Sequence, residues 1–206
     1  MKKVWSAEEK LQYERALQAK GYTLIAGVDE VGRGPLAGPV VCAAVIMPLD
    51  DDKMIVGVDD SKKLSAKKRE ELAEKIKATA LAYSIVEIDE KTIDEINILE
   101  ATKLGMKKAI ESLEPVPGVV LTDGNMYIDV QLKQYSVVHG DALSYSIGAA
   151  SIIAKVHRDK LMDEYDTQYP AYQFIKNKGY GTAAHIAAIK EQGLCPIHRR
   201  TFTKKF

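Results

Sequence analysis

Two adjacent acidic residues, Asp29 and Glu30, follow an apolar run and precede a glycine-rich turn. Residues 24–46 read LIAGVDEVGRGPLAGPVVCAAVI, so apolar segments flank a polar insert that holds both acids and Arg33. Two further acids follow later apolar runs, Asp123 in LTDGN and Asp141 in VHGDALS. Loops at strand ends of an α/β sheet can bring such residues together. Because carboxylate oxygens are hard ligands, the pattern predicts a site for Mg²⁺ or Mn²⁺ rather than Zn²⁺.

Clustered carboxylates of this kind suit phosphodiester hydrolysis. Two metal ions, roughly 4 Å apart, can activate a water and stabilise the leaving oxygen. Neighbouring residues of a strand point to opposite faces, so we expect the strand to kink or end at Asp29, which Gly32 would permit. The alternative is that each acid is a solvated turn residue, and spacing alone leaves both interpretations open.

Arg33 stands between Gly32 and Gly34. The backbone of such a turn can approach a ligand closely, and its amides can act as donors. A sugar hydroxyl is a natural target, and contact with a ribose 2′-OH would distinguish RNA from DNA. The alternative is a hairpin loop in which glycine serves only the turns.

The elements that must position these residues follow from periodicity and capping signals. Ser6 and Glu9 form a possible capping box for a helix over about 7–19 that stops at Gly21. Ser65 should cap a helix from about residue 66, and Thr182 should cap one that ends at Gly193. Apolar runs predict strands over 22–29, 40–47, 81–88, 118–123 and 135–141.

Two longer helices and one loop complete the prediction. A helix over 96–113 should bury a stripe, and another over 143–166 is rich in small residues and should pack closely. Residues 169–182 read as a loop. Strands followed by alternating helices and strands predict an α/β fold with a mixed sheet. The stripe of the first helix consists of Ile98, Leu99, Leu104 and Ile110.

Length and composition predict one domain. The 206 residues are 46% hydrophobic and 28% charged, with a formal net charge of zero. We expect a single catalytic domain over 1–206, with an N-terminal helical extension over 1–20 and a C-terminal helix and basic tail over about 182–206. Residues 176–206 carry seven basic residues against one acidic residue, a net charge of +6. That end could offer a face for phosphates, or it could be a solvated tail.

The remaining composition predicts a cytoplasmic protein. Its two cysteines, Cys42 and Cys195, form no CxxC motif, which fits a reduced compartment. The N-terminus lacks the apolar core of a secretory signal, and no apolar run approaches 18 residues, so we expect no membrane partner. The four histidines show no metal-pair spacing and are interpreted as structural or surface residues.

Motifs spread from residue 24 to the C-terminal end resemble bacterial ribonuclease HII, a type 2 ribonuclease H. The resemblance implies a ribonuclease H-like fold, with a mixed central sheet flanked by helices and a helical C-terminal part. It also implies a metal-dependent endoribonuclease that cleaves the RNA strand of RNA–DNA hybrids and incises 5′ of single ribonucleotides in duplex DNA. The motifs are GVDEVGRGPLAGPVV, DDSKKLS, INILEAT, LTDGN, HGDALSYSIGAASIIAKVHRD, NKGYGT and HRRTF.

The same resemblance implies product ends, partners and a biological role. The products carry 3′-OH and 5′-phosphate ends, and the reaction serves ribonucleotide removal and RNA primer processing in replication and repair. The partners are the hybrid and the ribonucleotide-containing duplex. A monomer without an obligate protein partner, using two Mn²⁺ or Mg²⁺ ions, is expected.

Residue roles carry over by motif. The four metal-binding acids match Asp29, Glu30, Asp123 and Asp141, and the 2′-OH reader matches Gly32, Arg33 and Gly34. Tyr180 matches the tyrosine that stacks on the neighbouring deoxynucleotide sugar, as a ring held out between glycines can do; otherwise it is an ordinary loop tyrosine. Lys62 and Lys63 resemble the family's phosphate-contacting turn; the alternative is that a lysine pair before a helix is a solvated face. Asn97, at the start of a helix, could present a further phosphate contact. The chain departs from the family pattern at His139, Gly148 and His157.

Two other functional classes stay open on the residues alone. A hybrid-binding module would use the basic end and Tyr180, but it gives no reason for four acids beside a polyanion. A metal-dependent phosphatase on small substrates explains the acids but not the basic end. Arg199 and Arg200 could hold duplex backbone or pair with acids of the fold.

Overall fold

The central feature is a five-stranded mixed sheet, seen in a computed structural model that describes residues 7–59 and 61–206. Its strand order is β3-β2-β1-β4-β5. Strand β1 pairs antiparallel with β2 and parallel with β4, so the sheet is mixed as predicted. The strands are β1 (Ile25–Val31), β2 (Val40–Ile46), β3 (Ala82–Ile88), β4 (Val119–Asp123) and β5 (Lys133–Val137).

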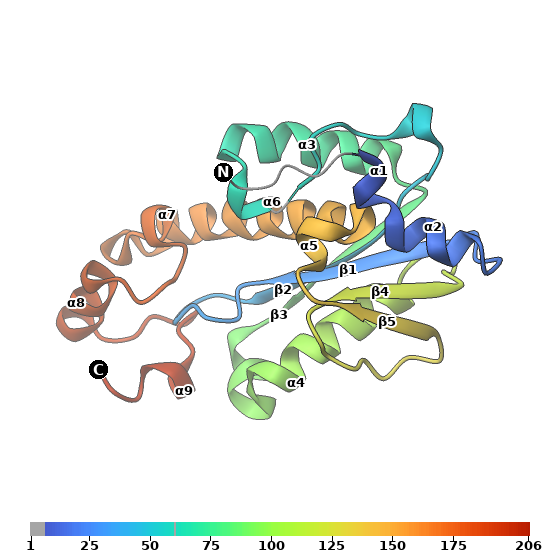
Figure 1. Ribbon diagram of the computed structural model, residues 1–206. Helices are drawn as coiled ribbons and strands as arrows, with labels where there is room; N and C mark the ends of the chain where they lie inside the picture. Colours follow the sequence, from blue (N-terminus) through green and yellow to red (C-terminus); the bar gives the residue numbers. More distant parts are fainter. Residues whose placement is uncertain (1–6, 60) are drawn as a thin grey trace.

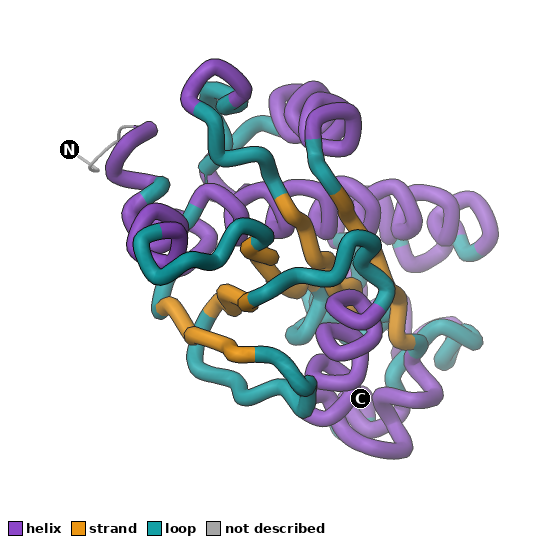
Figure 2. Tube along the Cα trace, turned by 90° about the vertical axis from the view of Figure 1, so that its right-hand side faces the viewer, coloured by secondary structure: helices purple, strands orange, loops and turns teal. Residues whose placement is uncertain are grey.

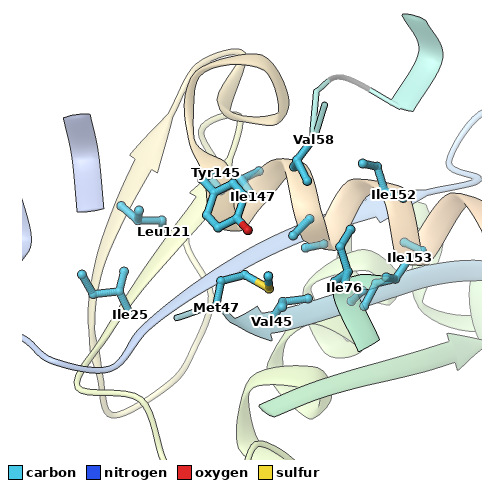
Figure 3. Packing of buried hydrophobic residues seen from close by; sticks show 14 of the residues in the cluster. Ile25, Val45, Met47, Val58, Ile76, Leu121, Tyr145, Ile147, Ile152 and Ile153 are labelled. Carbon is cyan, nitrogen blue, oxygen red and sulfur yellow. The ribbon is translucent and has the colours of Figure 1, made fainter. Parts of the chain in front are cut away.

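Both faces of the sheet are covered by long helices, α6 (Tyr145–Gln168) and α3 (Ala66–Thr79) on one side and α4 (Glu90–Glu111) on the other. Every residue of β2 is buried, as expected for a strand covered on two sides. Alternate residues of β1 and β2 therefore enter two different cores. Figure 3 shows the core on the α6 side, where Ile25 and Val45 of the sheet meet Ile147 and Ile153 of α6.

The small residues of α6 allow its close approach to β1. A Cβ added at Gly27 would lie 2.1 Å from the backbone carbon of Ser146, so the two backbones nearly touch there. A Cβ at Gly148 would lie 3.0 Å from the carbonyl oxygen of Asp141. The glycine at this departure from the family pattern is therefore accommodated by close packing. The predicted tight packing of this helix is confirmed.

Helix α4 differs from its prediction in two ways. It begins at Glu90, where Asp89 caps it by accepting from the Thr92 amide, and it is kinked at Asn97. The predicted apolar stripe was wrong at Leu99, whose side chain is 40% exposed. Leu99 lies in the first turn after the kink, ahead of the fully buried positions of that half of the helix, while Ile98 and Leu104 are partly buried. The buried positions of α4 are Ile93, Ala101, Thr102, Gly105, Met106, Ala109 and Ile110.

The N-terminal segment is two short helices rather than one, α1 (Ala7–Lys10) and α2 (Gln12–Gln18). Ser6, the predicted cap, lies outside the described residues. Leu11 and Leu17 enter the core on the α6 side. The buried carboxylate of Glu14 accepts from the Ser144 hydroxyl and the Ser146 amide, which ties this segment to the start of α6.

The C-terminal part is more helical than predicted. Residues expected to form a loop contain a 3₁₀ turn (Pro170–Tyr172) and α7 (Phe174–Asn177). Helix α8 (Ala183–Gln192) carries the predicted Thr182 cap, and α9 (Arg200–Thr203) was not predicted. The 3₁₀ turn, α7 and α8 gather at the C-terminal end of α6 (Figure 1) around a small core that includes Met162, Phe174 and Ile189. Phe202 of α9 packs instead against the core cluster that contains Ile88 and Ile93.

The remaining elements are short. They are two 3₁₀ turns, Asp51–Lys53 and Ser61–Lys63, and helix α5 (Gly140–Leu143). Over residues 7–59 and 61–206, no helix is both long and apolar enough to cross a membrane.

Candidate active site

Asp29 and Glu30 lie inside β1, so the expected kink between them was wrong. The strand continues to Val31 with regular pairing of Asp29 to Ala43 and Glu30 to Cys42. Asp29 is buried toward α6, and its Oδ1 accepts from the Glu30 amide at 2.8 Å. Regular pairing persists because β2 covers β1 up to Val31, and the chain turns only at Gly32, whose φ is +93°.

Asp123 ends β4 as predicted and lies beside Asp29. Val28 pairs with Thr122 in the parallel register, so the following residue of each strand lies at the same edge of the sheet. The Oδ1 atom of Asp123 accepts from the Gly140 amide at 2.6 Å. This bond links the end of β4 to the start of α5.

Asp141 lies in the first turn of α5, not at the end of a strand as predicted. Strand β5 ends at Val137, and His139 takes a left-handed conformation with a φ of +59° as the chain turns into the helix. Asp141 is buried, and the Lys62 ammonium lies 3.8 Å from its Oδ2. The fourth acid therefore reaches the site from a helix that Asp123 helps to hold.

The charges of these acids act on one another. Burial raises the pKa of Asp29 well above its usual value, and the neighbouring Glu30 and Asp123 raise it further. Burial also raises the pKa of Glu30, an effect that Arg33 partly offsets through an ion pair at 3.3 Å. Three carboxylates at one edge of the sheet thus destabilise one another as anions.

The acids do not form a closed ligand shell. In the part of the chain that the structure describes, no group of three or more His, Cys, Asp or Glu side chains is arranged to hold a metal ion. Asp29 and Asp123 instead accept from backbone amides, and Asp141 pairs with Lys62.

The glycine-flanked arginine and the predicted tyrosine come together. A Cβ added at Gly34 would lie 3.6 Å from the Tyr180 ring, so the ring faces the open side of this turn. Tyr180 is 44% exposed. The Leu36 amide donates to the Gly179 carbonyl at 2.8 Å, which joins the two loops next to these residues. The surface formed by Arg33, Gly34 and Tyr180, together with the buried Gly32 that precedes them, is called the junction surface below.

The three predicted phosphate contacts differ in position. Lys62 is near Asp141, with its side chain 80% exposed. Lys63 follows in the same 3₁₀ turn, and its side chain lies outside the described part of the structure. Asn97 sits at the kink of α4, where its Oδ1 accepts from the amides of Leu99 and Glu100. Among the described residues, no hydrogen bond or ion pair joins Asn97 to the four acids.

Two arginines lie behind the junction surface. Arg158 was not singled out from sequence, and Arg199 was expected to hold duplex backbone or to pair with acids. Arg158 and Arg199 are fully buried and donate to backbone carbonyls. Arg199 therefore does not face the solvent to hold a duplex. Buried arginines are rare unless they are paired. The two arginines stand in the sequences HRD (157–159) and HRR (198–200), and neither sequence indicates that backbone carbonyls are the partners.

The histidines are structural or surface residues, as expected, but two of them form a buried pair. His185 Nε2 lies 3.0 Å from His198 Nε2, and His185 Nδ1 lies 2.9 Å from the Tyr180 carbonyl oxygen. His157, at another departure from the family pattern, pairs with Glu87 at 2.6 Å on the surface.

Comparison with known proteins decides the family. The model of the family "Ribonuclease HII" matches residues 26–205. The chain belongs to the ribonuclease HII family. The ribonuclease HII of Ruminiclostridium cellulolyticum is 53% identical over 97% of this chain and 77% of its own length. That of Acetivibrio thermocellus is 55% identical over 94% and 75%. The protein is accordingly a hydrolase, an endoribonuclease of the ribonuclease H class.

Solved structures confirm the fold. The ribonuclease H2 of Pyrococcus horikoshii matches with a TM-score of 0.75 at 28% identity, covering 89% of this chain and 96% of that one. A ribonuclease HII of Archaeoglobus fulgidus, solved in complex with PCNA, matches with the same score at 26% identity, covering 88% and 95%. A Bst ribonuclease HIII solved with Mn²⁺ shares the fold at 20% identity and a TM-score of 0.62, covering 82% and 63%.

Proposed function

We propose that this ribonuclease HII family member is a divalent-metal-dependent endonuclease specific for ribonucleotides paired with DNA. It would cleave the RNA strand of RNA–DNA hybrids and incise 5′ of a single ribonucleotide in duplex DNA, leaving 3′-OH and 5′-phosphate ends. The observation that carries the proposal is the buried Asp29, which lies beside Glu30 and Asp123 at the edge of the sheet that leads into the junction surface.

The four acids fit a divalent cation by their chemistry. All their donors are carboxylate oxygens, which suit Mg²⁺ or Mn²⁺. The pKa of Asp29 is raised because burial and repulsion by Glu30 and Asp123 destabilise its ionised form. A bound cation would relieve that repulsion. Asp29, Glu30, Asp123 and Asp141 would hold the metal. Two bound ions would supply an activated water and stabilise the leaving oxygen.

The other residues of the site would bind and orient the substrate. Gly32, Arg33 and Gly34 would contact the 2′-OH through the backbone, and Tyr180 would stack on the sugar of the next deoxynucleotide. Lys62, Lys63 and Asn97 would contact phosphates. Arg33 also pairs with Glu30, so the sugar-reading turn is directly linked to the acids.

The two other classes explain less of the site. A binding module without catalysis would place buried acids beside phosphates with nothing to neutralise them. A small-substrate phosphatase has no use for the Tyr180 ring against Gly34, because that arrangement suits a nucleotide next to the one being cut. The nuclease accounts for both.

We further propose one catalytic domain over residues 1–206 that acts as a monomer without an obligate protein partner. Its reaction would serve ribonucleotide removal and RNA primer processing on DNA in the cytoplasm. The N-terminal helices would belong to this domain, since Leu11 and Leu17 enter its core.

The test is a cleavage assay on a DNA duplex that contains one ribonucleotide, with an all-DNA duplex and a long hybrid beside it. Each is incubated with Mg²⁺, Mn²⁺ or chelator, and the product ends are mapped. We expect a metal-dependent cut only at the 5′ side of the ribonucleotide. Cleavage of long hybrids alone would refute the role of Arg33 and Tyr180. No cleavage by folded protein would favour the binding module, and hydrolysis of mononucleotides would favour the phosphatase.

A further inference from the structure

Arg199 lies directly beneath the turn that carries Arg33, with all three guanidinium nitrogens engaged. Its Nη2 donates to the Gly32 carbonyl at 2.6 Å, its Nη1 to the Arg33 carbonyl at 3.0 Å, and its Nε to the Gly38 carbonyl at 2.9 Å. Its backbone amide donates to the Leu36 carbonyl. The buried Arg199 side chain thus binds three carbonyls of the segment from Gly32 to Gly38.

These bonds determine where the amides of the turn point. In a trans peptide the N–H is directed opposite to the C=O. The carbonyl of Gly32 shares a peptide with the Arg33 amide, and the carbonyl of Arg33 shares one with the Gly34 amide. Because both carbonyls are directed inward to Arg199, both amides are directed outward. Among the described residues, neither amide donates a hydrogen bond to another group of the protein.

Two neighbouring amides directed to the same side form a donor pair for an oxygen atom. They lie on the junction surface, where the Tyr180 ring faces Gly34. The buried guanidinium behind them adds to their positive potential. No ion pair joins Arg199 to a carboxylate in the described part of the chain, so peptide carbonyls take the place of a counterion.

A second buried arginine fixes this turn to the loop of Tyr180. Arg158 donates to the carbonyls of Ala37 and Pro39 on one side and to that of Lys178 on the other, at 2.9–3.1 Å. It also packs under Gly32, since a Cβ there would lie 2.2 Å from its Nε. The amide pair and the tyrosine are therefore held at a fixed separation.

We propose that Arg199 is a positioning residue for ribose recognition, which presents the amides of Arg33 and Gly34 to the 2′-OH by binding the carbonyls behind them. This rests on the proposed function, in which that turn reads the sugar. Lysine cannot replace it, because one ammonium group lacks the fixed fork that binds three carbonyls. Arg199 acts through the backbone and touches no substrate atom.

The test measures binding of two DNA duplexes that differ in one 2′-OH. Binding is followed by fluorescence anisotropy with Mg²⁺ in the Asp29→Asn background, in which cleavage is expected to be at least about 100-fold slower. The readout is the Kd of the all-deoxy duplex divided by that of the ribonucleotide duplex. We expect Arg199→Lys to lower this ratio at least fivefold and to change the Kd of the all-deoxy duplex less than twofold.

Ile189→Ala is the matched control for lost stability. Ile189 is buried in the same C-terminal core as Ala37 and Met162 but forms no part of the turn. Its truncation should lower the melting temperature and leave the ratio unchanged. All variants are measured at least 10 °C below their melting temperatures. An unchanged ratio in Arg199→Lys, or an equal fall in Ile189→Ala, would overturn the positioning role.

A second measurement applies if Arg199→Lys does not fold. In the Asp29→Asn protein, the amide NMR signals of Arg33 and Gly34 should shift with the ribonucleotide duplex and not with the all-deoxy duplex. Equal shifts with both duplexes would overturn the proposal. If the Asp29→Asn protein binds both duplexes with the same Kd, recognition of the sugar is refuted, and with it the proposed function. If it prefers the ribonucleotide duplex but the two amide signals do not shift, only the positioning role is refuted.

Discussion

Substitution of Gly32 by alanine tests how rigidly the turn is held. Gly32 has a φ of +93°, where an L side chain is strained. Its added Cβ would lie 2.2 Å from Arg158 Nε, 2.7 Å from Arg158 Cδ and 2.9 Å from the Pro39 carbonyl oxygen. Arg158 is itself held by three carbonyls, so it cannot simply swing away.

The expected loss of stability has two parts. The backbone conformation costs about 1–2 kcal/mol for a residue with a Cβ. Overpacking against a fixed neighbour costs about 1–3 kcal/mol more. The free energy of unfolding should therefore fall by about 2–5 kcal/mol, and the melting temperature by about 2–4 °C for each kcal/mol.

Gly21→Ala is the matched control, because it separates the two parts. Gly21 has a φ of +90°, and an added Cβ would meet nothing within 4 Å. It should therefore lose only the backbone part, about 1–2 kcal/mol. Urea unfolding of both variants gives the comparison, and cleavage of the single-ribonucleotide duplex below both transitions should fall only in Gly32→Ala. Equal losses of stability in the two variants would refute a rigid Arg158 beneath the turn.

Four further outcomes are expected. Gly34→Ala should change the free energy of unfolding, measured by calorimetry, by less than about 1 kcal/mol, because its Cβ makes only an ordinary contact with Tyr180. It should nevertheless slow cleavage in the duplex assay, because the added methyl group crowds the junction surface. Asp29→Asn should lose at least about 100-fold in cleavage while substrate binding persists, and in chelator it should melt at a higher temperature than the wild type, because a buried and repelled carboxylate is removed. Mg²⁺ or Mn²⁺ should raise the melting temperature of the wild type and not that of Asp29→Asn, since only a site with its acids intact gains stability by binding; equal shifts would contradict the metal assignment. Burial lowers the pKa of His185 and lowers that of His198 to about 4, so the unfolded chain binds protons near the ordinary pKa of 6.5 that the folded state does not bind. The free energy of unfolding should therefore fall as the pH drops from 6.5 to 4, by up to about 1.4 kcal/mol per pH unit for each proton, and urea titrations of His198→Gln should show a smaller fall.

Much of the fold could be predicted because its signals are local. Apolar runs defined the five strands, although the true strands differ from the predicted ones by a few residues. Ser65 and Thr182 cap their helices as predicted, by accepting from the amides of Lys68 and His185. These features depend on residues within one turn or one strand, so the sequence displays them directly.

The candidate acids could also be predicted, since carboxylates after apolar runs are visible in the chain and match a family motif. The element that carries each acid into the site could not be predicted. Asp141 comes from a helix because the left-handed His139 turns the chain after β5, and Glu30 stays in β1 because β2 pairs with it. Both results depend on backbone pairing and turns that residue types only weakly specify.

The sequence by itself thus determined the family and the sheet, and it predicted which acids are the candidates for the site. Only the tertiary structure showed what supports the surface beside them. Arg199 binds carbonyls that lie 166 and 167 positions earlier in the chain, and Arg158 binds others about 120 positions earlier. A backbone carbonyl is present at every residue and leaves no mark in the sequence. Such partners become identifiable only when folding buries the guanidinium groups among them.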